Sequence, residues 1–167
     1  MNFIDEAYLE VRAGDGGSGA SSFRREKYIP FGGPDGGDGG KGGNILFKVN
    51  QNTNTLIDFQ NKKIFEAKNG QKGSGKNKSG ADGDDLVIHV PKGTVIYDNL
   101  TNEELMDCTD ENLEYLIVKG GEGGHGNARF KSATNRAPRK STPGFKGELR
   151  SLRSVSYTHL RAHETRS

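Results

Sequence analysis

A glycine run with a period of three is the strongest constraint on the fold of this chain. Between Gly32 and Gly43 the sequence reads GGPDGGDGGKGG, and from Gly36 on its glycine pairs recur every three residues. This period fits neither an α-helix nor a β-strand, but it fits a polyproline II helix, which has three residues per turn and no internal hydrogen bonds. Since glycine has no Cβ, neighbouring extended chains can approach closely and hydrogen-bond to one another. We therefore interpret the run as a packing device.

Collagen and a flexible linker are the other interpretations of such a run. Collagen requires long Gly-X-Y tracts rich in proline, whereas this chain has 5 Pro in 167 residues. A flexible linker is typically rich in serine, while this run has none and lies between two strand-like segments. The composition argues against collagen, and the linker stays as the alternative to packing.

The composition also argues against a large conventional core. Hydrophobic residues make up 31% of the chain, Trp is absent and Gly supplies 25 positions, so stability must depend on backbone packing. The 8 Phe and 5 Tyr are enough for a small core. No apolar run approaches the ~20 residues of a membrane span, and residues 1–12 lack the layout of a secretory signal. We therefore expect a cytoplasmic protein.

Short alternating or apolar runs between the glycine clusters predict strands. They lie at residues 7–11, 44–49, 86–90, 94–97 and 115–118. In the first of them Ala7, Leu9 and Val11 alternate with polar residues, which predicts one buried face. Residues 56–63 and 102–106 are the best helix candidates. We predict an all-β fold in which the strands form a small barrel or sandwich.

Charge is segregated along the chain, although the formal net charge is only +2. Residues 98–114 contain seven acidic and no basic side chains, whereas residues 129–146 contain six basic and no acidic ones. The basic residues lie in loops bordered by glycine, and in places they alternate with aromatic residues. Phosphates favour Arg and Lys, and unpaired bases stack on Phe or Tyr, so these loops predict contact with RNA. An ordinary solvated surface is the alternative.

The candidate RNA-binding residues fall in three loops. The expected phosphate contacts are Arg24, Arg25, Lys27, Lys72, Lys76, Lys78, Arg129, Lys131, Arg136, Arg139 and Lys140, with Tyr28 and Phe130 as stacking candidates. His125 lies in a glycine loop, where contact with a ligand or nucleic acid is open.

Motifs that suggest nucleotide binding are incomplete in this chain. Residues 14–19 and 121–126 satisfy GxGxxG, but no amphipathic helix follows either to hold a pyrophosphate. Residues 70–77 nearly spell a P-loop, yet Asn77 stands where a Ser or Thr is needed to bind magnesium. We therefore predict no nucleotide site, cofactor or catalytic residue in this chain.

The acidic, histidine and cysteine residues do not predict a metal site. The loop carboxylates lack the spacing of an EF-hand, and Asx turns and capping explain them more simply; they are Asp35, Asp38, Asp82, Asp84 and Asp85. His159 and His163 stand four apart without a third ligand. Cys108 is the one cysteine, so it can form no internal disulfide, and we expect it to serve packing.

The end of the chain differs in kind from what precedes it. Residues 155–167 resemble the translation of a transposase adapter used in sequencing libraries, and the preceding pattern stops at Leu152 and Arg153. We therefore predict a glycine-rich domain at residues 1–153 and a non-native tail at residues 154–167.

Several motifs occur in a fixed order along residues 1–153. They are GDGGSG at 14–19, SFRREKYIP at 22–30, the run at 32–43, LIDF at 56–59, Lys76-Asn77, DLVIHVPKGT at 85–94 and GGEGGHGN at 120–127. Single motifs of this kind are weak, but their number and order are specific. Together they resemble the N-terminal domain of the Obg/CgtA GTPases.

The resemblance implies an Obg fold, in which glycine-rich polyproline II helices pack side by side and join a small β-barrel. It implies a bacterial, monomeric protein that acts in biogenesis of the large ribosomal subunit and binds rRNA near the peptidyl-transferase region. The contacting loops would be residues 23–35, 72–84 and 129–146. GTP and magnesium would bind a GTPase domain that follows in the parent protein and is missing here. The alternative is a protein-interaction module that docks a regulatory partner or that GTPase domain.

Overall fold

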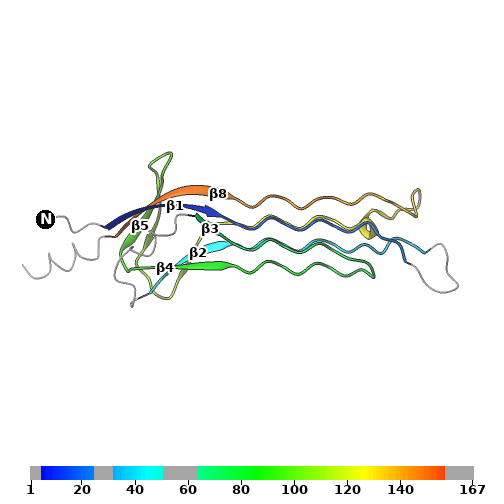
Figure 1. Cartoon of the computed structure of the whole chain (residues 1–167), viewed down its shortest axis with the longest axis horizontal. Coiled ribbons are helices and arrows are strands. Elements are labelled where there is room, and N and C mark those ends of the chain that lie inside the picture. The colour runs from blue at the N-terminus through cyan, green and yellow to red at the C-terminus, as the bar shows by residue number, and fades with distance from the viewer. Residues whose placement is uncertain (1–4, 25–31, 51–63, 157–167) are drawn as a thin grey trace, which may run out of the picture.

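The strands lie at one end of an elongated molecule, and extended glycine-rich segments run from them to the other end (Figure 1). This computed structural model describes residues 5–24, 32–50 and 64–156. The elements are β1 (Asp5–Arg12), β2 (Ile45–Val49), β3 (Ile64–Glu66), β4 (Leu86–Val90), β5 (Thr94–Asp98), β6 (Glu104–Cys108), β7 (Glu114–Val118), the 3-10 helix η1 (Asn127–Phe130) and β8 (Leu149–Ser156).

The strands form two sheets. The larger has the order β3-β1-β8-β5-β6, with β3 parallel to β1 and the other neighbours antiparallel. The smaller has the order β4-β2-β7, in which β2 is parallel to β4 and antiparallel to β7. The all-β class is therefore confirmed. The expected barrel is wrong, because the two sheets are not closed around a common axis.

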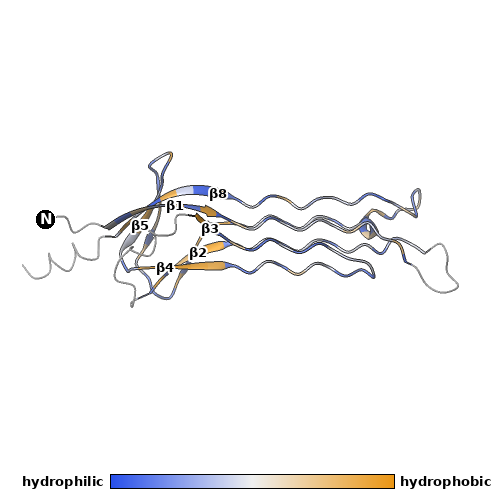
Figure 2. Ribbon diagram, in the orientation of Figure 1, coloured by the Kyte–Doolittle hydropathy of each residue, from blue (hydrophilic) through white to orange (hydrophobic). Residues whose placement is uncertain are grey.

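A small apolar core holds the two sheets together. Val11, Ile45, Phe47 and Val90 are completely buried in it, and β2 and β4 stand out as apolar in Figure 2. The predicted alternation of β1 is confirmed, since Ala7, Leu9 and Val11 are buried while Tyr8 is exposed. Each large aliphatic or aromatic side chain buried here contributes about 1.5–3 kcal/mol relative to exposure.

Beyond the sheets, six extended segments form what we call the rod: residues 13–21, 36–44, 67–74, 78–85, 119–126 and 139–148. Backbone hydrogen bonds join these segments in steps of three residues. The amides of Gly14, Gly17 and Ala20 donate to the carbonyls of Gly43, Gly40 and Gly37, at 2.8–2.9 Å. The amides of Ala13, Gly16 and Gly19 donate, by the same step, to Glu148, Phe145 and Thr142 on another segment. The rod is therefore a lattice of separate segments that satisfy one another's backbone groups.

Glycine is required in the rod because the segments pack backbone against backbone. A Cβ added to Gly39 would lie well inside 3.0 Å of the Gly17 carbonyl, and one added to Gly17 would meet the Gln71 carbonyl equally closely. Real Cβ atoms essentially never approach other atoms within that distance. The interpretation of the run at 32–43 as a packing device is thus confirmed from Gly36 onward, and the linker alternative is wrong there.

All five predicted strands are present. The ends of four of them agree with the prediction to within one residue, and β1 is longer than predicted at both ends. The helix expected at residues 102–106 is wrong, since Glu104–Cys108 forms β6. Asp98 starts a tight turn there: its Oδ1 accepts from the amides of Leu100 and Thr101, and Asn102 follows at φ 66°. The chain thus reverses into an antiparallel strand. The second helix candidate, at residues 56–63, lies outside the described residues.

The last strand extends beyond the predicted end of the domain. β8 continues through Ser154, Val155 and Ser156, which pair with both β1 and β5 and are buried. The Ser154 hydroxyl is buried without a hydrogen-bond partner. The assignment of residues 154–167 to a non-native tail stays a prediction.

Candidate nucleic-acid interface at the tip

Three chain reversals meet at the end of the rod that is farthest from the sheets (Figure 1). We call their described residues, 22–24, 32–35, 75–77 and 127–138, the tip. The first reversal begins as an antiparallel ribbon, in which Phe23 pairs with Pro34 and the Arg24 amide donates to the Gly33 carbonyl at 2.9 Å. The second is a tight turn at Lys76 and Asn77, whose φ values are 60° and 56°. The third contains η1 and the loop that follows it.

Asn127 joins the first and third reversals from a completely buried position. Its Oδ1 accepts from the amide of Gly36 at 2.8 Å and from that of Ser22 at 3.4 Å. Its Nδ2 donates to the carbonyls of Ser22 at 2.9 Å and Pro138 at 3.0 Å. Both ends of the amide are therefore satisfied, as a buried polar group requires. One side chain thus fixes three chain segments at the base of the tip.

Asp35 joins the first and second reversals. Its carboxylate accepts from the Ser22 hydroxyl at 2.5 Å and from the Lys76 amide at 3.0 Å, while its carbonyl accepts from the Asn77 amide at 2.7 Å. The Ser22 hydroxyl and then the Lys76 amide hold the pKa of Asp35 below its usual value. These bonds also explain how Lys76 and Asn77 keep a left-handed conformation that disfavours most side chains.

Asp38 anchors the third reversal. Its Oδ1 accepts from the Gly126 amide at 2.9 Å, and its Oδ2 accepts from Arg129 Nε at 2.6 Å. Burial opposes the charged form of Asp38, but donation from Gly126 and Arg129 outweighs it, so the pKa of Asp38 is lowered. Arg129 is thus held by a carboxylate of the rod, and its charge is partly balanced there.

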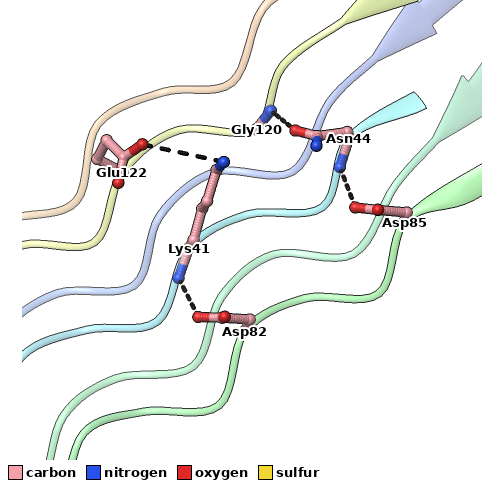
Figure 3. Close-up of polar contacts among 6 residues, drawn as sticks. All are labelled: Lys41, Asn44, Asp82, Asp85, Gly120 and Glu122. Carbon is pink, nitrogen blue, oxygen red and sulfur yellow. Dashed lines mark hydrogen bonds and ion pairs between the residues drawn. The ribbon is translucent and has the colours of Figure 1, made fainter. Parts of the chain in front are cut away.

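Two of the other candidate loop carboxylates, Asp82 and Asp85, belong to the rod lattice. Figure 3 shows the arrangement: the Lys41 amide donates to Asp82 and the Asn44 amide to Asp85, both at 2.8 Å, while the Gly120 amide donates to Asn44 Oδ1 at 2.7 Å. Carboxylate and amide side chains thus accept hydrogen bonds from backbone N–H groups of the rod that do not donate to another backbone carbonyl. A structural role is confirmed for Asp82 and Asp85, but their partners lie on a neighbouring segment, so the expected local Asx turns and caps are not what these two carboxylates form.

The structure places nine of the predicted cations on the surface, at or near the tip. The exposed residues are Arg24, Lys72, Lys76, Lys78, Arg129, Lys131, Arg136, Arg139 and Lys140. Lys72 and Lys78 lie on the rod next to the second reversal, and the others lie on the tip or at its border. Arg25, Lys27 and Tyr28 lie outside the described residues. Loops far apart in the sequence are therefore brought to one end of the molecule.

Phe130 lies in a cluster with a cation and a second ring. The Lys140 ammonium is 5.4 Å from the centre of the Phe130 ring, and the His125 ring meets Phe130 edge-on with centroids 6.4 Å apart. Phe130 is partly buried. A base that stacked on the face covered by Lys140 would have to displace that ammonium.

Sequence reasoning missed the residues that organise the tip. Asn127, Asp35 and Ser22 connect the reversals, yet each lies in a polar stretch that resembles any loop. A weak signal was available for Asn127, which ends a glycine cluster where a third GG pair would continue the period. Its partners, at residues 22, 36 and 138, could not be deduced without the neighbours of each segment.

The described ranges hold neither a cluster of metal ligands nor a membrane-spanning helix. No three His, Cys, Asp or Glu side chains among the residues the structure describes are placed to share a metal ion. In the same part of the chain, no helix is long and apolar enough to cross a membrane. Cys108 is buried in the core, and burial followed by the nearby Asp107 raises the pKa of its thiol to about 12.

Comparison with known proteins identifies the family. The family model described as GTP1/OBG matches residues 4–155, which is nearly the whole described chain. The chain belongs to the GTP1/OBG family. It is 54% identical over 153 residues to the GTPase Obg of Psychrobacter sp. and 53% identical over 148 residues to the GTPase Obg of Magnetococcus marinus.

Each match covers most of this chain but a much smaller share of the relative. They include 92% and 89% of this chain but 38% of each GTPase Obg. The chain therefore spans less than two fifths of the length of the curated relatives it matches.

Proposed function

We propose that this chain is the ribosome-docking domain of an Obg-type GTPase that acts in biogenesis of the large ribosomal subunit. The tip binds rRNA near the peptidyl-transferase region, and the rod acts as a stiff handle with packed glycine helices of the polyproline II type. GTP and magnesium bind elsewhere in the longer protein. The family membership supports the parent activity, and the tip supports the mode of binding.

The gathering of cations at one end carries this proposal. RNA presents a dense row of phosphates, and a protein binds it by bringing several Lys and Arg side chains to one face. The tip does this with residues from three distant loops, while acidic residues dominate residues 98–114 at the sheet end. The molecule therefore has one end that attracts a polyanion and another that repels it.

Binding to purified large ribosomal subunits at increasing salt tests the proposal. If six or more phosphates are neutralised, affinity falls by about 10³-fold or more between ~50 and ~200 mM salt. The double variant Arg136→Glu and Arg139→Glu should abolish binding, because it reverses two exposed tip charges. The matched control is Lys92→Glu with Lys119→Glu, two exposed lysines at the sheet end, which should bind like the parent chain. Salt-insensitive binding, or equal loss in both variants, would overturn the proposal.

Three exposed apolar side chains on the outer face of the larger sheet favour a second candidate, docking of a protein partner. Tyr8, Ile64 and Leu149 are 53%, 48% and 55% exposed, and the register of β1 with β3 and β8 places them on the same outer face. Such a face suits a regulatory protein or the GTPase domain. A pull-down with Tyr8→Ser and Leu149→Ser separates the two candidates: partner binding should fall while subunit binding stays intact.

A further inference from the structure

Gly33 differs from the glycines of the rod. An added Cβ at each described rod glycine would run into a backbone carbonyl inside 3.0 Å. At Gly33 the one described neighbour is the Lys131 ammonium, at 3.7 Å from the added Cβ, which is an ordinary contact with the end of a flexible side chain. Packing within the described residues therefore does not require glycine at this position.

Backbone conformation does not require glycine at Gly33 either. Among the described glycines, Gly93 is the one with positive φ, at 87°. Gly33 lies in the ribbon that starts the first reversal, where its carbonyl accepts from the Arg24 amide. Glycine in such a position costs stability relative to alanine, because it loses more conformational freedom on folding. Among the described residues neither packing nor backbone conformation calls for glycine here, so close approach of a group from outside the chain is a physical reason that they leave open.

The surroundings of Gly33 indicate the chemistry of that group. Lys131, from the third reversal, points its ammonium at the open α-carbon face of Gly33. At the preceding residue, the Arg24 side chain begins next to Gly32, since a Cβ added there would collide with the Arg24 backbone and Cβ. Two cations that are 107 positions apart in the sequence therefore flank one glycine step at the tip. A small, negatively charged group that must approach the backbone closely fits this arrangement, and a phosphate is such a group.

We propose that the Gly32-Gly33 step, flanked by Arg24 and Lys131, is a subsite for a single backbone phosphate of RNA. The inference rests on the proposed function and assigns one point of contact within it. The missing Cβ of Gly33 lets the sugar-phosphate chain reach the protein backbone, and Lys131 supplies the charge. A methyl group at this position would hold the phosphate away from the ammonium.

Gly33→Ala tests the subsite because the added methyl group should weaken binding of RNA without lowering the stability of the fold. The variant should melt at the temperature of the parent chain or higher, while its affinity for purified large ribosomal subunits falls at least tenfold. Lys131→Gln should weaken binding comparably and reduce the slope of log affinity against log salt by about 1, the value for one phosphate contact. Lys119→Gln, at the sheet end of the rod, is the control and should change neither quantity.

Each outcome distinguishes the subsite from the proposed function. If Gly33→Ala binds like the parent while the Arg136 and Arg139 double variant loses binding, the subsite is wrong and the function stands. If Gly33→Ala melts several degrees lower, internal packing explains the glycine and the subsite is wrong. If inorganic phosphate raises the melting temperature of the parent but not of Gly33→Ala, the subsite takes a free phosphate and the assignment to RNA is overturned. A parent chain that does not bind subunits overturns both proposals.

Discussion

The sheet end is stabilised by packing of side chains, whereas the rod is stabilised by packing of backbone against backbone. At the sheet end, side chains such as Phe47 and Ile45 fill a small core, and the backbone bonds run within ordinary sheets. In the rod, the residues at the contact positions are glycines, so the backbones themselves make the contact, with hydrogen bonds repeated every three residues. The rod therefore packs closely because its contact positions lack a Cβ, so it should tolerate added atoms far less than the core tolerates removed ones.

The largest expected effect comes from adding a methyl group to the rod. Gly39→Ala should lower the free energy of unfolding by about 3 kcal/mol or more, because the new Cβ meets the Gly17 carbonyl and neither backbone can move without breaking the lattice. Ile45→Val, which removes one methylene from the core, should cost about 1 kcal/mol. Urea denaturation of both variants measures the difference, with Gly33→Ala as the control that adds the same methyl outside the lattice. If Gly39→Ala and Ile45→Val lowered the free energy of unfolding equally, the claim that the rod is less tolerant of change than the core would be wrong.

Asn127→Ala should produce the next largest effect. It removes a buried amide with four hydrogen bonds and leaves the Gly36 amide and the Pro138 carbonyl without their partner, at a cost of about 2–3 kcal/mol. Asn135→Ala changes an exposed amide in the same loop and should stay within about 0.5 kcal/mol. Thermal melts compare the two. A small effect of Asn127→Ala would show that the tip does not depend on this side chain.

Acid should weaken the junction at Asp35. The pKa of Asp35 is lowered in the folded chain, chiefly by the Ser22 hydroxyl, so the carboxylate contributes stability that is complete above its unfolded pKa of about 3.9 and is lost as pH falls through the folded value. Asp35→Asn should cost about 1.5 kcal/mol at neutral pH, because charged hydrogen bonds are lost. The variant should also lose less stability than the parent between about pH 5 and pH 2. Parallel acid titrations of stability for both chains would refute the role of this carboxylate.

The smallest predicted change is a gain of stability in the sheet end. The Ser154 hydroxyl is buried without a partner between β1 and β5, so Ser154→Ala should raise the free energy of unfolding by about 1 kcal/mol. Ser151→Ala, on the same strand and partly exposed, serves as the control. A loss of stability in Ser154→Ala would mean that the hydroxyl is satisfied in solution.

The rod could be predicted from the sequence because its period is a direct consequence of its packing. Gly36, Gly39 and Gly42 stand three apart because each faces a neighbouring backbone, and that requirement is visible in one segment alone. The strands were equally visible, because β1 and β2 alternate or run apolar over their length. β6 was mistaken for a helix because residues 102–106 contain helix-favouring Glu, Leu and Met, while the turn at Asp98 decided the structure.

The organisation of the tip could not be predicted, for a physical reason. The partners of Asn127 and Asp35 lie on other segments of the lattice, and the period of three fixes the spacing within a segment but not which segments are neighbours. The same holds for the meeting of Arg24 and Lys131 at Gly33. The sequence indicated which residues are cationic, and the arrangement of the rod decided which of them lie together.

Native-state hydrogen exchange tests the central claim, that the rod is a rigid backbone lattice. The amides of Gly17, Gly40 and Gly124 donate to neighbouring segments, so they should exchange as slowly as the amides of Ile45 and Val90 in the sheets. NMR detection resolves these positions individually. Protection of the three glycine amides at the level of the core is the predicted result, and exchange near the rate of an unfolded chain would contradict the account.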